Sequence, residues 1–201
     1  MKILELFAGS RSIWKEWELL WNEVFSSDIT QFWNIHYVVD ILEFDISKLP
    51  FKPDIIWASP PCQWFSVAAI GRNWNIDWTP KTDSARLWIR LLEKTLSIIR
   101  DINPTYFFIE NPRGKMRKMK QLDWIQRHTV TYCQYWDSRM KPTDIWTNND
   151  NWKPRKMCKN WDPCHISAPR WSKTWTQWLK WDYERSKIPE QLCKEIILSC
   201  M

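Results

Sequence analysis

Residues 54–63 read DIIWASPPCQ, a short apolar run that ends in Ser-Pro-Pro-Cys-Gln. The run is too short for a helix, and the two prolines after it fix the backbone, so it predicts a buried strand with a defined turn at its carboxyl end. Two other stretches have the same form. Residues 2–8 read KILELFA before Gly9, and residues 105–109 read TYFFI before Glu110.

Helical patterns lie between these runs, the longest of them at Ser84–Arg100, with a leucine-rich face. Alternating strands and helices predict an open α/β fold with a mostly parallel central sheet, whose ligands lie beyond the carboxyl ends of the strands. We expect strands at Ile3–Phe7, Glu23–Ser27, His36–Val39, Asp54–Ala58, Thr105–Ile109 and Thr129–Tyr135, and further helices at Ile13–Leu20 and Ile188–Cys200.

The character of the chain changes after residue 147. Residues 148–182 are polar, basic and rich in tryptophan, and their prolines favour irregular structure. We therefore divide the chain into a core, 1–147, a small irregular insert, 148–182, and a C-terminal segment, 183–201, whose helix returns to the core.

Composition narrows the class of protein. The chain has 201 residues, a net charge of +6 and six cysteines at irregular spacing. Its length fits one domain, and its basic charge fits an enzyme or a nucleic-acid binder. The sequence has no apolar run of about 18 residues, so we expect no membrane span. The cysteine spacing favours a reducing compartment over a disulfide scaffold.

Two residues at predicted strand ends could carry chemistry. Cys62 is a candidate nucleophile because a thiolate attacks strongly when its pKa is lowered, although an inert buried thiol is an equal alternative. Glu110 follows an apolar strand, where burial would raise its pKa and let it hold or donate a proton, although a loop or capping carboxylate would look the same. Asp28 and Asp40 end two other strands and would face the same crevice.

In this order, the motifs resemble those of the cytosine-5 DNA methyltransferases. LFAGS (6–10) looks like the first motif of that family, PPCQ (60–63) like its nucleophile motif and ENP (110–112) like its glutamate motif. Gln134 with Arg139 loosely resembles the QxRxR motif, and RSKIP (185–189) resembles the closing motif. The resemblance implies a Rossmann-like methyltransferase that uses S-adenosylmethionine and flips a cytosine out of double-stranded DNA.

The resemblance also implies residue roles. Cys62 would attack carbon 6 of the base, Glu110 would hold or protonate N3, and Arg139 would help to anchor the base or the Cys62 loop. The implied cofactor-binding residues are Phe7, Ala8, Gly9, Ser10, Asp28, Asp40, Ile41 and Ser186.

The basic residues predict the DNA surface. A positive run follows the glutamate motif, where it could bind phosphates, although a solvated helix face would have the same composition. The expected phosphate contacts are Arg113, Lys115, Arg117 and Lys118, with Arg170 and Lys173 in the recognition insert. We expect a monomer in the cytoplasm, near the nucleoid, with a restriction endonuclease as a candidate partner. The alternatives are a tRNA cytosine methyltransferase, an inactive DNA-binding module and a nicotinamide oxidoreductase.

A metal site is not assigned from the sequence. Cys158, Cys164 and His165 lie close together and Cys133 could join them, but C-x5-C-H is not a usual zinc-ligand spacing.

Tryptophan is abundant and glycine scarce. The chain has 18 Trp and 3 Gly, whereas glycine is normally about 7% of residues. Trp64 and Trp136 stand where turns would suit glycine. One hypothesis is that many of these tryptophans are UGA codons that some bacterial lineages translate as glycine. The alternative is a genuinely tryptophan-rich protein.

Overall fold

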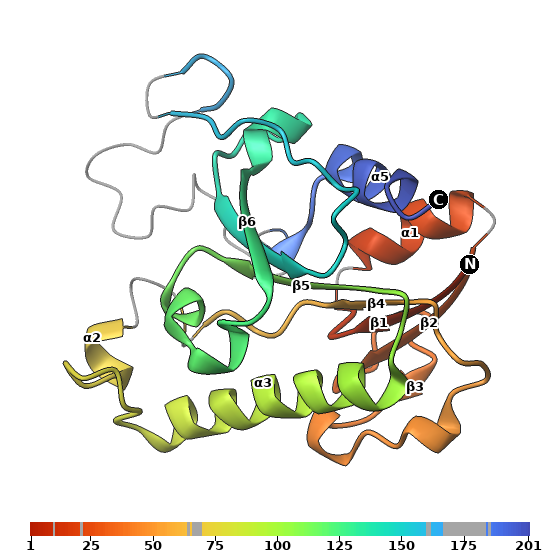
Figure 1. The fold of residues 1–201 in the computed structure, drawn as a ribbon, viewed down its shortest axis with the longest axis horizontal. Coiled ribbons are helices and arrows are strands. Elements are labelled where there is room, and N and C mark those ends of the chain that lie inside the picture. Colours follow the sequence, from red (N-terminus) through yellow and green to blue (C-terminus); the bar gives the residue numbers. More distant parts are fainter. Residues whose placement is uncertain are drawn as a thin grey trace.

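The computed structural model describes residues 1–9, 11–20, 22–63, 65, 70–159, 162–166, 184 and 186–201. In these residues one seven-stranded sheet has the order β3-β2-β1-β4-β5-β7-β6 (Figure 1). Its strands are β1 (Lys2–Leu6), β2 (Glu23–Asp28), β3 (Tyr37–Val38), β4 (Ile55–Ala58), β5 (Tyr106–Pro112), β6 (Gln126–Thr131) and β7 (Pro142–Thr147).

The strand directions confirm the predicted α/β class. β3, β2, β1, β4 and β5 pair in parallel, whereas β7 runs antiparallel to both β5 and β6. The carboxyl ends of β1, β2, β4 and β5 therefore lie at one edge of the sheet. Ligands bind at this edge in open α/β folds.

Helices cover both faces of the sheet. The long helix α3 (Asp83–Ile102) lies along one face, and α1 (Ser12–Leu19) and α5 (Glu190–Leu198) lie together on the other (Figure 1). Thr82 starts α3 by accepting a hydrogen bond from Ala85 N, and Asn103 ends it with a left-handed φ of 51°. The other helices among the residues that the structure describes are α2 (Ile70–Asn73) and the 3₁₀ turns η1 (Ile41–Glu43), η2 (Ile46–Lys48), η4 (Lys115–Lys118), η5 (Lys120–Leu122) and η6 (Tyr132–Tyr135).

The central strands are buried on both faces. Ile56 and Phe107 belong to the core under α3, whereas their neighbours Ile55 and Phe108 belong to the core under α1 and α5. This double burial explains why β4 and β5 are continuous apolar runs rather than alternating ones. Among the described residues, no helix has the length and apolarity that a membrane crossing requires.

Two regions differ from the sequence expectation. The predicted strand Thr129–Tyr135 begins earlier, as β6, and stops at Thr131, because the chain then tightens into η6. β7 was not expected, and its pairing with β5 extends that strand through Glu110 to Pro112. The glutamate motif thus lies inside a strand rather than after it.

Candidate active site

The loop after β4 carries Cys62 and is fixed by contacts from β5 and η4. Asn111 Nδ2 donates a hydrogen bond of 2.7 Å to Pro60 O, across 51 residues of sequence. Phe65 N donates to Cys62 O at 3.1 Å, and Lys115 N donates to Phe65 O at 2.7 Å. The position of the Cys62 backbone is therefore set by the neighbouring strand and not by the loop alone.

Glu110 is a buried carboxyl group on β5 with 5% of its surface exposed. Tyr132 OH donates a hydrogen bond to its Oε1 at 3.1 Å, and the Ser59 hydroxyl is a second partner. Burial raises the pKa of Glu110, and this effect outweighs the nearby Lys141 charge and the two hydrogen bonds, which lower it. The carboxyl group consequently keeps its proton to a higher pH than an exposed glutamate does.

Lys141 lies near both Cys62 and Glu110, and the sequence analysis did not identify it as a site residue. Its ammonium interacts electrostatically with both Glu110 and Cys62, while burial lowers the pKa of Lys141. Its Nζ lies 4.7 Å from the centre of the Tyr132 ring. A signal was present in the sequence, because the QxRxR motif ends in two basic residues with one residue between them, and Arg139 and Lys141 have the same spacing. The structure therefore gathers a thiol, a carboxyl group and an ammonium at the carboxyl edge of the sheet.

Arg139 holds the C-terminal segment. Its guanidinium pairs with the Asp137 carboxylate and donates hydrogen bonds to the carbonyl oxygens of Glu184, at 3.1 Å, and Lys187, at 3.2 Å. Ile188 N in turn donates to Ser12 Oγ, at the start of α1, at 3.1 Å. These contacts make Arg139 a positioning residue that connects the segment before α5 to the core.

The turn between β1 and α1 is tightly bent and connected to β2. Phe7, Gly9 and Arg11 all have left-handed φ values, of 57°, 35° and 54°. Gly9 N donates to Asp28 Oδ2 at 3.0 Å, and Thr30 N donates to Asp28 Oδ1 at 2.8 Å. A Cβ at Gly9 would make only ordinary van der Waals contacts, the nearest with Phe7 O at 3.8 Å. A glycine backbone beside a carboxylate suits a nucleoside with ribose hydroxyls.

The other residues predicted to bind the cofactor differ in burial and in their hydrogen-bond partners. Asp40 Oδ1 accepts a hydrogen bond of 2.9 Å from Leu42 N and so caps η1, whose first residue, Ile41, is buried. Ala8 is buried beside β2, where its N donates to Ser27 O at 3.1 Å. Ser186 is exposed, and Ser10 lies outside the described residues.

Lys115, a predicted phosphate contact, is packed inside the protein. It is 1% exposed, and its Nζ lies 4.8 Å from the ring centre of Trp74 and 4.2 Å from that of Trp78. Burial lowers the pKa of Lys115. In this conformation its ammonium faces two indole rings instead of solvent.

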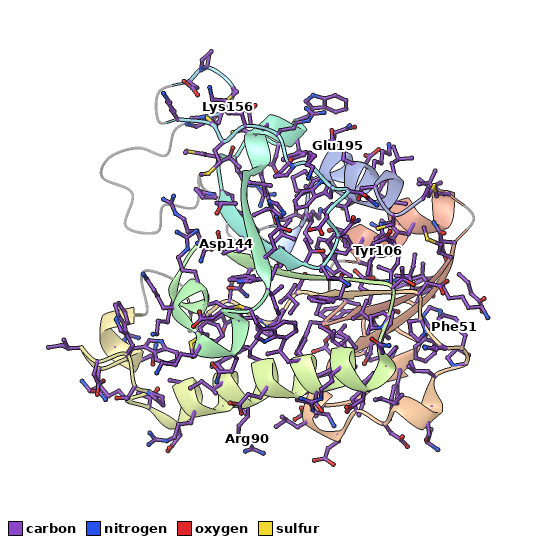
Figure 2. The ribbon with its side chains drawn as sticks, in the orientation of Figure 1. Phe51, Arg90, Tyr106, Asp144, Lys156 and Glu195 are labelled. Atoms are coloured by element: carbon purple, nitrogen blue, oxygen red, sulfur yellow. The ribbon has the colours of Figure 1, made fainter. Side chains whose placement is uncertain are left out.

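Arg117 is also committed to an internal contact. Its guanidinium makes a bidentate pair with the fully buried Asp144, at 2.9 and 2.5 Å (Asp144 is labelled in Figure 2). Arg113 and Lys118, by contrast, are exposed, which narrows the phosphate contacts expected from this run to these two residues. Arg170 and Lys173 lie outside the described residues.

One family model and one curated protein match this chain in sequence. Residues 1–129 match the family model for C-5 cytosine-specific DNA methylase. A protein of Frog virus 3 (isolate Goorha), described as "Probable DNA (cytosine-5)-methyltransferase", is 32% identical over 189 residues, which are 85% of this chain and 83% of the viral protein.

Solved structures support the fold. A methyltransferase of Entamoeba histolytica matches with a TM-score of 0.54 at 14% identity, and covers 79% of this chain and 57% of its own. A prophage-encoded DNA modification methyltransferase of E. coli matches with a TM-score of 0.52, also at 14% identity, and covers 79% and 52%. The chain thus spans little more than half the length of these structures. The family model and the viral relative establish that the chain belongs to the cytosine-5 DNA methyltransferase family.

Proposed function

We propose that this protein transfers a methyl group from S-adenosylmethionine to carbon 5 of a flipped cytosine in double-stranded DNA, through a covalent bond between Cys62 Sγ and carbon 6. One observation carries the proposal. Cys62 and the protonatable Glu110 interact with the same Lys141 ammonium at the carboxyl edge of the sheet. A nucleophile and a proton donor that both interact with one cation suit an attack on a polarised pyrimidine ring.

The chemistry begins with the Cys62 thiolate. Its sulfur forms a bond to carbon 6 while the Glu110 proton moves to N3, so negative charge does not accumulate on the ring. Carbon 5 then carries the electron pair that accepts the methyl group. A water molecule takes the carbon 5 proton, departure of the Cys62 thiolate restores the aromatic ring, and N3 returns its proton to the Glu110 carboxylate.

The remaining residues divide into binding and positioning roles. Tyr132 and Ser59 orient Glu110 through their hydrogen bonds, and Lys141 stabilises the thiolate. When bound, S-adenosylmethionine supplies an electrophilic methyl group. The β1–α1 turn at Gly9 and the Asp28 carboxylate fit its polar nucleoside portion, with Asp40 and Ile41 beside it.

The nucleic-acid assignment rests on charge and on family membership. Arg113 and Lys118 are exposed after β5, close in sequence to Glu110, where they can bind phosphates next to an extruded base. Binding as a monomer, a place near the nucleoid and a restriction endonuclease as partner remain predictions of this assignment.

Transfer of labelled methyl groups tests the substrate. We expect S-adenosylmethionine to label a mixed-sequence DNA duplex in a cytosine-dependent way and to leave tRNA unlabelled. Labelling of tRNA alone would replace the DNA assignment with the RNA one, and no labelling of either would support an inactive binding module.

Trapping tests the covalent step. With S-adenosylmethionine present, duplex DNA that contains 5-fluorocytosine should form an adduct that resists denaturation, because after methylation the fluorine at carbon 5 cannot leave as a proton does. Cys62→Ala should abolish the adduct. Cys200→Ala is the control, because it changes a buried thiol that follows α5 in the chain and belongs to none of the site motifs, and it should keep the adduct. An adduct that survives Cys62→Ala would assign the nucleophile elsewhere.

A further inference from the structure

Three cysteines and one histidine come together outside the methyl-transfer site. Cys133 lies in η6, whereas Cys158, Cys164 and His165 lie in the segment after β7. One potential ligand atom from each residue lies within 4.8 Å of all the others. The fold therefore assembles a set of donors from two chain segments that are separated in sequence.

The donor atoms of these four residues lie close enough together to surround a single ion. Cys164 Sγ lies 3.6 Å from Cys133 Sγ, 3.0 Å from Cys158 Sγ and 3.7 Å from His165 Nδ1, and Cys158 Sγ lies 3.3 Å from His165 Nδ1. Zinc–sulfur bonds of about 2.3 Å in a tetrahedron place the ligand sulfurs about 3.8 Å apart. Small outward shifts of the side chains would thus leave room for one ion.

The donor types select the metal. Thiolates are soft ligands that favour zinc over magnesium or calcium, and three Cys with one His is a common set for structural zinc. Four protein ligands fill a tetrahedron and leave no position for water or substrate. A metal here would therefore stabilise structure and would take no part in catalysis.

The backbone around the cluster is already ordered by other contacts. Cys158 N donates to Thr131 Oγ1 at 2.9 Å, and Gln134 Nε2 approaches Cys164 Sγ at 3.4 Å. Between the cysteines, Lys159 N donates to the Asp162 carboxylate at 2.8 Å and bends the chain. Partners of this kind hold metal ligands in place before the ion binds.

A second attachment lies just before the cluster. Arg155 donates to Gln134 O at 2.6 Å and pairs with Glu195 on α5 at 2.9 Å. Figure 2 labels Glu195 and Lys156, the residue that follows Arg155 in the chain. Further along the chain, Ile166 N donates to Ser138 O at 2.9 Å, so contacts to η6 and to the residues just after it are made from both 155–159 and 162–166. An ion at the cluster would fasten this segment to the core.

We propose that Cys133, Cys158, Cys164 and His165 bind one zinc ion, which anchors the first part of the 148–182 segment to η6. The sequence spacing led us to assign no metal, and the three-dimensional arrangement motivates the opposite assignment. Binding converts three thiols to thiolates and releases their protons, with His165 neutral. The proposal does not depend on methyl transfer.

Metal analysis of the purified chain tests the proposal. We expect one zinc ion per chain, and a zinc content equal to a buffer blank for Cys164→Ser and for His165→Ala. Cys62→Ser is the matched control, because it removes a thiol outside the cluster. It should keep the zinc while losing the covalent adduct with DNA, so the two proposals can fail separately.

Cobalt substitution tests the site without relying on variants that could fail to fold. Chelator-treated wild-type protein titrated with Co²⁺ should develop the intense visible bands of tetrahedral cobalt with thiolate ligands, with an endpoint of one ion per chain. Octahedral cobalt spectra would overturn the proposal. So would a metal-free protein whose mass and thiol titration show a Cys158–Cys164 disulfide, or free thiols that do not respond to cobalt.

Discussion

At the level of single residues, the burial of Glu110 favours the protonated form that the proposed reaction needs. A charged carboxylate would be costly at this depth, so burial raises its pKa, and the proton it keeps is the one that N3 of a cytosine would need. Tyr132, whose own pKa is raised well above the ordinary value by burial, remains a hydrogen-bond donor to Glu110.

Glu110→Gln should separate activity from stability. Because the folded pKa is raised, the native state binds more protons than the unfolded state from about pH 4.3 up to the folded pKa, and stability falls as pH rises through that window. The variant lacks this titration, so its unfolding free energy should lose that pH dependence. Methyl transfer should fall about 10²–10⁴-fold. Urea unfolding across pH and labelled transfer measure the two effects, and an unchanged pH profile would contradict the assignment.

Trp136 and Trp78 bear on the tryptophan hypothesis. Both have a φ of 68°, a conformation that glycine adopts freely, and Trp136 is 78% exposed. Trp57, by contrast, is 1% exposed and stacks on Phe108 with 5.8 Å between ring centres. The structure therefore contains tryptophans that suit their positions and others at positions typical of glycine.

Trp136→Gly should stabilise the protein by about 1 kcal/mol, because a side chain in the left-handed region costs about 1–2 kcal/mol. Trp57→Gly should instead destabilise it by at least about 3 kcal/mol, since it empties a core position. Chemical denaturation checks both values. The coding DNA gives an independent test, because UGG at codons 64 and 136 would end the recoding hypothesis.

At the level of elements, the junction between β5 and the loop after β4 positions Cys62, the proposed nucleophile. Asn111→Ala should remove the hydrogen bond to Pro60 O and release the Cys62 loop. We expect the rate of adduct formation to fall at least about tenfold, while Cys62 itself remains present. Asn75→Ala, which removes an exposed hydrogen bond to Thr79, is the control and should leave the rate unchanged. Equal rates for all three proteins would show that the loop needs no such support.

Local sequence predicted those elements whose pattern is local. β1 and β4 are apolar runs with turns after them, β2 is a short strand that ends at an aspartate, and α3 has an apolar helical face, so each was expected within a few residues. β7 has a more polar sequence, PTDIWT, than β1 or β4, and it forms because β5 and β6 pair with it on both sides. Such pairing joins residues far apart in the chain and cannot be seen in a single segment.

The same limit applied to the site. Cys62 and Glu110 were predicted because each ends a buried run within a recognisable motif. The internal contacts of Lys115 and Arg117 depend on Trp74, Trp78 and Asp144, which come from other segments, so composition alone suggested that both would face DNA.

At the scale of the whole molecule, the net charge of +6 includes cations such as Lys115 and Arg117, which make internal contacts and so do not face DNA. Binding should weaken steeply with salt, because each phosphate contact contributes about −0.9 to the slope of log K against log salt. Lys118→Ala should reduce the magnitude of that slope by about 1. Arg117→Ala should instead lower the unfolding free energy, because it leaves Asp144 buried and unpaired. Fluorescence anisotropy with labelled duplexes over a salt series measures the slopes, and an unaltered slope for Lys118→Ala would exclude it as a contact.

Because β7 runs antiparallel to β5, its first residues lie beside the carboxyl end of β5, where the candidate site residues are. A parallel neighbour of β5 would offer its last residue to the reactive edge, whereas β7 offers its entry point, with Thr143 opposite Pro112 and Lys141 just ahead of it. A single change of strand polarity thus places the Lys141 cation where it interacts with Cys62. A relative that restored the parallel direction would have to recruit its positive charge from another part of the chain.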